Sequence, residues 1–264
     1  MTDYIFCVDS DGCVMDTMTY KHQLFFGPVA ADIFEIADRE SFLAEWNKVN
    51  LYSKTRGINR FVGLLTCLKI AGVADIDRLE DWVRTTKSLS NESLEDTLKV
   101  NPSDDLRKTL DWSVQVNKLI KTYEGPVLSF EGAKETLEFL KSKGKVFVVS
   151  SANKGAVQEE WENQGLLEFV DDLYCQDRGK KEDVLAQLVQ NSSEATSILM
   201  IGDSPGDLQA AKQNRVCFYP ILVGQETLSW ENLNKTYIQY FLNNQWNQDV
   251  ETDLSNQFWN NLEH

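Results

Sequence analysis

The sequence predicts an α/β fold, in which a doubly wound parallel sheet is interrupted by a long helical insertion. Three short apolar runs, each followed by small or polar residues, are typical of buried parallel strands: YIFCV (4–8), KVFVV (145–149) and ILMI (198–201). Helical patterns separate the later runs, and this strand–helix–strand repetition predicts a sheet whose ligands bind beyond the carboxyl ends of the strands.

The remaining elements of this core are weaker in the sequence. Further strands are predicted at LYC (173–175) and VCFYPIL (216–222), and helices at residues 131–144, 181–190 and 207–214. In the first of these helices Leu137 and Leu140 share one face, and Gly144 is predicted as its C-cap.

The distance between the first two strong strands is far too long for a single crossover helix. Residues 17–125 have an almost entirely helical pattern and are predicted to form a separate helical domain. Its tryptophans lie at helical spacing among leucines and are predicted to pack in its core: Trp46, Trp82 and Trp112. Residues 1–16 and 126–264 then form the α/β core, with a helical extension from about residue 223.

The composition excludes several classes of partner. Among the 264 residues the net charge is −15, which argues against nucleic acids and anionic membranes, since both need a basic surface. No apolar run reaches the roughly 18 residues of a membrane helix, and a strand begins almost at once, which leaves no room for a signal peptide. The five cysteines are scattered without a CxxC pair, so we expect reduced thiols and a cytoplasmic protein.

Residues that could act in catalysis or bind a ligand follow four of the predicted strands. The first strand ends in Asp9-Ser10-Asp11-Gly12 and the second in Ser150-Ser151, while Lys180-Lys181 opens a helix and Gly202-Asp203, with Asp207, follows ILMI. Each group also has a structural interpretation. The aspartates of the first could form an Asx turn, Ser150 could be an ordinary loop hydroxyl, and Asp207 could cap the helix that Ser204-Pro205 begins.

Taken together in this order, the four groups resemble the motifs of the haloacid dehalogenase superfamily. DSDGCVMDT is similar to the first motif, VFVVSS to the second, KKEDVLAQL to the third and IGDSPGD to the fourth. The resemblance spans about 200 residues and implies a Rossmann-like core with an inserted helical cap. Ser10 departs from the pattern, because relatives commonly have a bulky apolar residue there.

The resemblance also implies roles for these residues. Asp9 would attack phosphorus to form an aspartyl phosphate, and Asp11 would protonate the leaving oxygen and later deprotonate the attacking water. Gly12 would allow the sharp turn that brings both to the phosphate. Mg²⁺ would be held by the Asp9 side chain, the Asp11 carbonyl and Asp203.

The second and third motifs would contact the phosphate. Ser150, with Ser151 beside it, would donate a hydrogen bond, and a lysine would neutralise the transferring group. Lys181 is preferred over Lys180 because of its spacing to the apolar residues of the helix, and a lysine at a helix N-terminus is disfavoured by the dipole unless it has another role. Asp207 would hold this lysine or support the metal.

Within the insertion, Gly57-Ile-Asn-Arg60 resembles the substrate loop of β-phosphoglucomutase and phosphoglycolate phosphatase relatives. There an arginine grips a distal anionic group, which suits the fork of a guanidinium. An ordinary loop followed by a helix start explains Gly57 and Arg60 equally well.

The resulting expectation is a Mg²⁺-dependent phosphatase, a phosphoric monoester hydrolase that acts on a small phosphorylated metabolite as a monomer or homodimer. A phosphomutase with the same site is the alternative within this chemistry. A non-catalytic metabolite-binding or regulatory protein is the alternative outside it.

Overall fold

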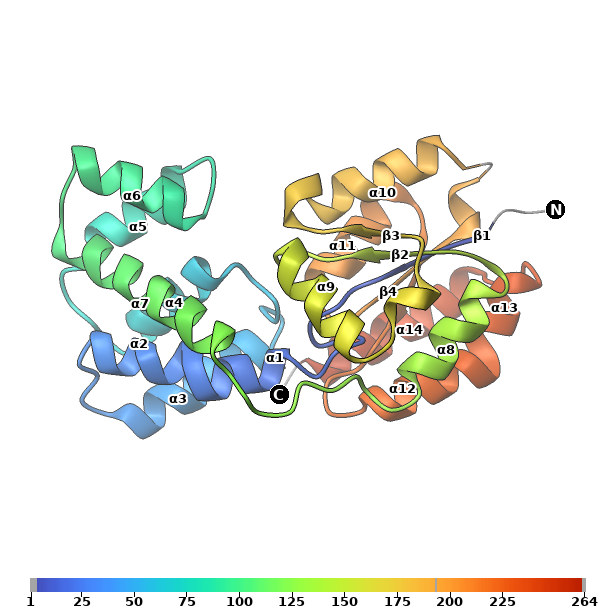
Figure 1. Cartoon of the computed structure of the whole chain (residues 1–264), viewed down its shortest axis with the longest axis horizontal. Coiled ribbons are helices and arrows are strands. Elements are labelled where there is room, and N and C mark those ends of the chain that lie inside the picture. Colours follow the sequence, from blue (N-terminus) through green and yellow to red (C-terminus); the bar gives the residue numbers. More distant parts are fainter. Residues whose placement is uncertain (1–3, 193, 263–264) are drawn as a thin grey trace. The chain divides into compact units, whose positions relative to one another are not determined.

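The computed structural model of the chain describes residues 4–192 and 194–262 (Figure 1). The outermost residues of the predicted core, 1–3 and 263–264, lie outside the described residues, as does residue 193. The chain divides into two compact units. We call Met1–Met18 with Pro126–His264 the core unit and Thr19–Gly125 the helical unit.

The core unit contains a five-stranded sheet in which every pairing is parallel. Its strands are β1 (Tyr4–Val8), β2 (Gly144–Val149), β3 (Asp172–Tyr174), β4 (Ile198–Gly202) and β5 (Cys217–Pro220), in the spatial order β3-β2-β1-β4-β5. Since the order reverses direction at β1, the sheet is doubly wound, as predicted. Both weakly predicted strands exist: β3 begins one residue earlier than predicted, and β5 is shorter than its apolar run.

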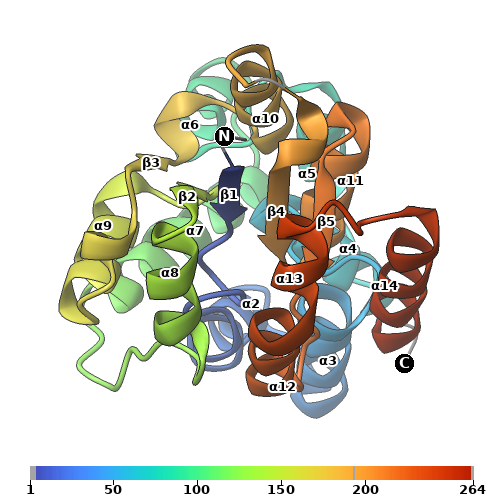
Figure 2. The ribbon, with the colours of Figure 1, turned by 90° about the vertical axis from the view of Figure 1, so that its right-hand side faces the viewer.

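Helices cover both faces of this sheet (Figure 2). Connections between the strands contain α8 (Ala133–Lys141), α9 (Lys154–Asn163), α10 (Lys181–Gln190) and α11 (Pro205–Asn214), with short 3₁₀ turns at Leu167–Phe169, Gln176–Arg178 and Ala195–Ser197. The apolar residues of α8 and α9 pack in one cluster with alternate residues of β1, and those of α10 and α11 pack in another with the intervening residues. The period-two alternation of strand side chains therefore divides the core into two layers.

The C-terminal extension folds against the edge of the sheet. It comprises α12 (Glu226–Asn232), a π-helical turn (Leu233–Tyr237), α13 (Ile238–Leu242) and α14 (Gln248–Asn261). Helix α14 lies beside β5 (Figure 2) and contributes Leu254 to one core layer and Phe258 to the other. The extension thus covers an edge strand that would otherwise be open to pairing with another chain.

The helical unit is inserted between β1 and β2. The chain enters it through α1 (Met18–Tyr20), which begins at the last residue of the core unit's first segment. Its further elements are a π-helical turn (Lys21–Phe26), α2 (Gly27–Ile33), α3 (Arg39–Asn47), a second π-helical turn (Lys48–Tyr52), α4 (Arg60–Ile70), α5 (Asp77–Thr85), α6 (Asn91–Val100) and α7 (Asp104–Lys121). Trp46, Trp82 and Trp112 are buried together, so the predicted core packing of these tryptophans is confirmed. Among the described residues, no helix combines the length and the apolar character needed to span a membrane.

The prediction of Gly144 as a helix C-cap is wrong. Helix α8 ends at Lys141, and Gly144 is the first residue of β2. A Cβ atom at Gly144 would lie 2.2 Å from the Tyr4 carbonyl oxygen of the neighbouring strand. Glycine is required at this position because the backbone of β1 approaches it closely, and not because a helix ends there.

Candidate active site

The register of the sheet brings three of the predicted site residues together at the carboxyl ends of the strands. Val8, the last residue of β1, pairs with Val148 on one side and with Ile201 on the other. Asp9 continues this alignment, since its N–H donates to the Ile201 carbonyl at 3.0 Å. Asp9, Ser150 and Asp203 therefore leave three adjacent strands at the same edge, which is where parallel sheets bind ligands.

The loop after β1 is a tight turn organised around the carbonyl oxygen of Ser10. That oxygen accepts from the N–H groups of Cys13, Val14 and Met15 at 3.3, 3.1 and 2.9 Å. Gly12 has φ +81°, in the left-handed region that favours glycine, and its N–H donates to the Met15 carbonyl at 2.8 Å. This geometry explains why glycine follows the second aspartate.

The Asp9 carboxylate is buried and has a different partner at each oxygen. Its Oδ1 accepts from the Ser10 N–H at 2.8 Å, and its Oδ2 lies 2.8 Å from the Lys181 Nζ. Burial raises the pKa of Asp9 to about 8, with Asp207 and Asp203 adding to the rise while Lys181 opposes it. The Lys181 ammonium thus does not offset the burial of the Asp9 carboxylate together with the repulsion from Asp207 and Asp203.

Lys181 lies between two of these carboxylates. Its Nζ is 2.6 Å from Asp207 Oδ1 as well as 2.8 Å from Asp9 Oδ2. Burial by itself would lower the pKa of Lys181, but the two carboxylates outweigh it and raise the pKa, so the amine is charged. Lys180, by contrast, is the N-cap of α10 and is exposed.

Asp207 both contacts the lysine and caps the helix that follows β4. Its Oδ1 accepts from Lys181, while its Oδ2 accepts from the Ser204 N–H at 3.0 Å and from the Ser204 hydroxyl at 2.7 Å. The Ser204 Oγ accepts in turn from the Asp207 N–H, which completes a capping box at the start of α11. A Cβ atom at Gly202 would lie 2.4 Å from the Asp207 Cγ, so glycine leaves the space that this carboxylate fills.

Three buried carboxylates form a candidate metal site. Asp9, Asp203 and Asp207 each offer an oxygen, and these oxygens all lie within 4.8 Å of one another. Carboxylate oxygens are the hard ligands that Mg²⁺ prefers. A divalent cation would also supply the positive charge that Lys181 alone does not, so the donor set and its electrostatics fit Mg²⁺.

Asp11 lies on the same loop but outside this carboxylate cluster. Its Oδ1 accepts a hydrogen bond from the hydroxyl of Thr17, which is fully buried. Asp11 itself is half-buried. Our sequence interpretation missed Thr17, although its place in the Asp-Thr pair at the end of the first motif was a usable signal.

Ser150 and Ser151 differ in burial. Ser150 is buried, its N–H donates to the Tyr174 carbonyl at 2.9 Å, and its Oγ accepts from the Ala152 N–H at 3.2 Å. Ser151 is exposed. Helix α9 then begins after Asn153, whose side chain accepts from the Gly155 N–H at 2.9 Å.

Gly57 and Arg60 belong to the helical unit. Gly57 has φ +73°, and Arg60 is the first residue of α4, after the N-cap Asn59. The guanidinium of Arg60 donates to Asn117 Oδ1 at 2.6 Å and lies over the ring of Phe26 at 4.9 Å. Locally these residues form a turn and a helix start, which is one of the two interpretations left open by the sequence.

Two buried tryptophans that our sequence analysis did not associate with the site contact the loop after β1. The indole N–H of Trp161 donates to the Ser10 hydroxyl at 2.8 Å, and that of Trp230 donates to the Cys13 carbonyl at 3.0 Å. The Ser10 hydroxyl, a departure from the motif, therefore has a specific partner. No local sequence pattern connects residues more than 150 positions apart.

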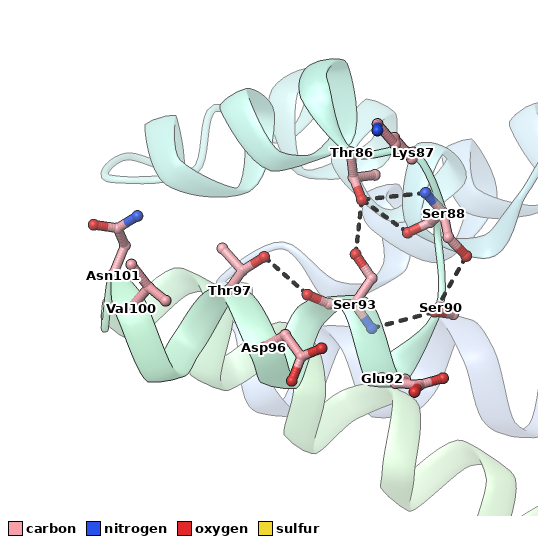
Figure 3. Close-up of a pocket in the computed structure, with 10 residues that line it drawn as sticks. All are labelled: Thr86, Lys87, Ser88, Ser90, Glu92, Ser93, Asp96, Thr97, Val100 and Asn101. Carbon is pink, nitrogen blue, oxygen red and sulfur yellow. Dashed lines mark hydrogen bonds between the residues drawn. The ribbon is translucent and has the colours of Figure 1, made fainter.

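A polar hollow of about 540 Å³ lies in the helical unit, between the end of α5 and α6 (Figure 3). Hydroxyl groups of Thr86, Ser88, Ser90 and Ser93 bond to one another there and cap α6. None of the predicted site residues lines it, and its serine and threonine hydroxyls are engaged with one another. We therefore place the candidate site at the buried carboxylates and not in this hollow.

We compared the sequence and the fold with those of known proteins to find the family of this chain. The sequence profile of haloacid dehalogenase-like hydrolases matches residues 78–220, just over half of the chain. No curated protein matched the sequence.

Solved structures share the fold at low sequence identity. A putative phosphoglycolate phosphatase from Lactobacillus delbrueckii is 17% identical with a TM-score of 0.51, and the alignment covers 83% of this chain and 85% of that one. A predicted phosphoglycolate phosphatase from Haemophilus somnus is 14% identical, with the same TM-score of 0.51 and the same 83% and 85% coverage. Together with the profile match, the parallel sheet and its helical insertion, these findings show that the chain belongs to the haloacid dehalogenase-like hydrolases.

Proposed function

We propose that this hydrolase is a Mg²⁺-dependent phosphatase that cleaves a small phosphorylated metabolite through a phosphorylated Asp9. The contact of Asp9 Oδ2 with Lys181, 2.8 Å away inside a cluster of three buried carboxylates, is the observation that carries the proposal. This arrangement brings a nucleophile, a fixed positive charge and a site for a hard cation together at the carboxyl ends of the strands. The resemblance of the four motifs supports the same chemistry.

The first step of the proposed reaction uses both aspartates of the loop. An Asp9 carboxylate oxygen attacks phosphorus, the bond from phosphorus to the ester oxygen breaks, and the Asp11 carboxyl gives its proton to that leaving oxygen. The hydrogen bond from the Ser10 N–H fixes Asp9 Oδ1, which directs the other oxygen toward Lys181. The ammonium of Lys181 then stabilises negative charge on the transferring phosphoryl group.

In the second step, Asp11 removes a proton from water as the water attacks phosphorus. The bond between phosphorus and Asp9 breaks, and inorganic phosphate and the free carboxylate are released. The Asp9 side chain, the Asp11 carbonyl and Asp203, supported by Asp207, would hold Mg²⁺, which would neutralise phosphate charge and favour the ionised form of Asp9. Ser150, at the end of β2, would donate its hydroxyl to a phosphate oxygen.

The test is phosphate release from a panel of small phosphorylated metabolites, with Mg²⁺ and with chelator. Wild-type protein is compared with Asp9→Asn and with Asp177→Asn, which removes an exposed carboxylate outside the cluster. We expect Mg²⁺-dependent turnover that falls by more than about 10³-fold in Asp9→Asn and is unchanged in Asp177→Asn. Equal turnover in wild type and Asp9→Asn, or no turnover of any compound by folded wild type, contradicts the proposal.

A further inference from the structure

We propose that Trp161 and Trp230 are positioning residues for the loop that carries Asp9 and Asp11, which makes the C-terminal extension part of the catalytic apparatus. The inference rests on the proposed phosphatase function for its kinetic consequence. It is carried by two indole hydrogen bonds that reach the loop from elements outside the four motifs.

Trp161 acts on the residue that orients the nucleophile. It lies in α9 and is fully buried, and its indole N–H donates to the equally buried hydroxyl of Ser10 at 2.8 Å. The N–H of Ser10 donates in turn to Asp9 Oδ1 at 2.8 Å. A shift of Ser10 would therefore rotate the Asp9 carboxylate away from Lys181.

Trp230 holds the far end of the same turn. It lies in α12 of the extension, is fully buried, and donates to the Cys13 carbonyl at 3.0 Å. Helix α12 is itself tied to the sheet, because the hydroxyl of Tyr219 in β5 donates to the Ser229 carbonyl at 2.8 Å. Helix α12 of the extension thus connects the loop to β5 through these two hydrogen bonds.

The two indoles add to the hydrogen bonds that tie the loop to its surroundings. The bonds to the Ser10 carbonyl close the turn on itself, the Asp9 N–H donates to the Ile201 carbonyl, and the far end of the loop pairs with residues 128–130. None of these bonds reaches the Ser10 hydroxyl or the Cys13 carbonyl, which the indoles contact. Loss of an indole donor leaves a buried acceptor without its partner, and a displacement of about 1 Å in a reacting group can cost a factor of about 100 in rate.

The experiment uses phenylalanine substitutions, which keep an aromatic ring and remove the N–H donor. Trp161→Phe and Trp230→Phe are compared with Trp246→Phe, a control in the same extension whose indole nitrogen is buried and has no hydrogen-bond partner among the described residues. With the best substrate of the panel, we expect kcat to fall about tenfold or more in the first two variants. KM should stay within about twofold in all three, and kcat should be unchanged in the control.

A double-mutant cycle separates positioning from a general loss of packing. Ser10→Ala and Trp161→Phe remove opposite ends of one hydrogen bond, so the double variant should lose less than the product of the single losses in kcat. Multiplicative losses, or kcat values equal to that of Trp246→Phe, would overturn the proposal.

Hydrogen exchange provides a readout that needs no substrate. The amides of Cys13, Val14 and Met15, which donate to Ser10, should exchange at least about tenfold faster in Trp161→Phe and Trp230→Phe than in the control, measured well below the unfolding transition of each. Unchanged exchange overturns the inference whatever the activity is. Failure of wild type to release phosphate, with faster exchange in the variants, instead overturns the phosphatase proposal and leaves the positioning by the two indoles established.

Discussion

At the scale of single residues, Lys181 and its neighbour Lys180 have very different surroundings. The ammonium of Lys181 lies 2.8 Å from Asp9 and 2.6 Å from Asp207, with only 11% of its side chain exposed. Lys180, its neighbour in the sequence, points a similar charge into solvent. Lys180 is the N-cap with an extended backbone, whereas Lys181 is the first residue of α10, so only Lys181 reaches the carboxylates.

Replacement of these lysines by methionine tests this assignment. We expect Lys181→Met to lower phosphate release at least about 100-fold, because the transferring phosphoryl group loses a buried positive charge. The matched variant Lys180→Met should change it by less than about twofold, since the side chain is exposed. Circular dichroism of both variants checks that they are folded, and a larger loss in Lys180→Met would reverse the assignment.

At the scale of elements, the beginning of β2 requires glycine, whereas the beginning of α11 does not. Gly144 faces the Tyr4 carbonyl across the β1–β2 pairing, where an added Cβ would be 2.2 Å from the oxygen. In the first turn of α11, an added Cβ at Gly206 would be 3.5 Å from the Ser204 Oγ, an ordinary contact.

Alanine at these two glycines should therefore have opposite effects on stability. Gly144→Ala should lower the free energy of unfolding by about 1–3 kcal/mol, because two backbones must move apart. Gly206→Ala should raise it by up to about 1 kcal/mol, because alanine favours the helix. Urea unfolding of both variants measures these changes, and a neutral Gly144→Ala would show that the strands separate without cost.

At the scale of the whole molecule, an ion pair ties α8 to the edge of the sheet. Lys141 Nζ lies 2.7 Å from Asp171 Oδ1, and the Val146 N–H donates to Asp171 Oδ2 at 2.9 Å. Burial acts to raise the pKa of Asp171, but the hydrogen bonds from Lys141 and Val146 outweigh it and hold the pKa below its usual value. A lowered carboxyl pKa stabilises the fold above the pKa of the unfolded chain, and this contribution is lost as pH falls through the folded pKa.

The effect of Asp171→Asn should therefore depend on pH. We expect the variant to be less stable than wild type at pH 7, and the difference to shrink as the pH falls toward about 3. Urea unfolding at both pH values measures it, with Asp177→Asn as an exposed control. A stability difference that grows toward low pH would contradict the sign argued here.

The sequence determined the doubly wound sheet, because buried parallel strands are short and apolar and their separation by helical patterns leaves few alternatives. It also determined the order of the four strand-end groups, since a local pattern is enough to place Asp9, Asp203 and Lys181 at the ends of elements. The helix start at Ser204-Pro205 was likewise readable, because a capping box involves residues three apart.

Only the tertiary structure decided which of these groups meet. The contacts of Lys181 with Asp9 and Asp207 join residues distant in the chain. The same holds for the contacts of Trp161 and Trp230 with the loop after β1. Gly144 was misassigned for the same reason, since the Tyr4 backbone that excludes a side chain belongs to another strand. Local patterns report propensity, whereas contacts across the sheet depend on register and packing, which no single segment of the sequence encodes.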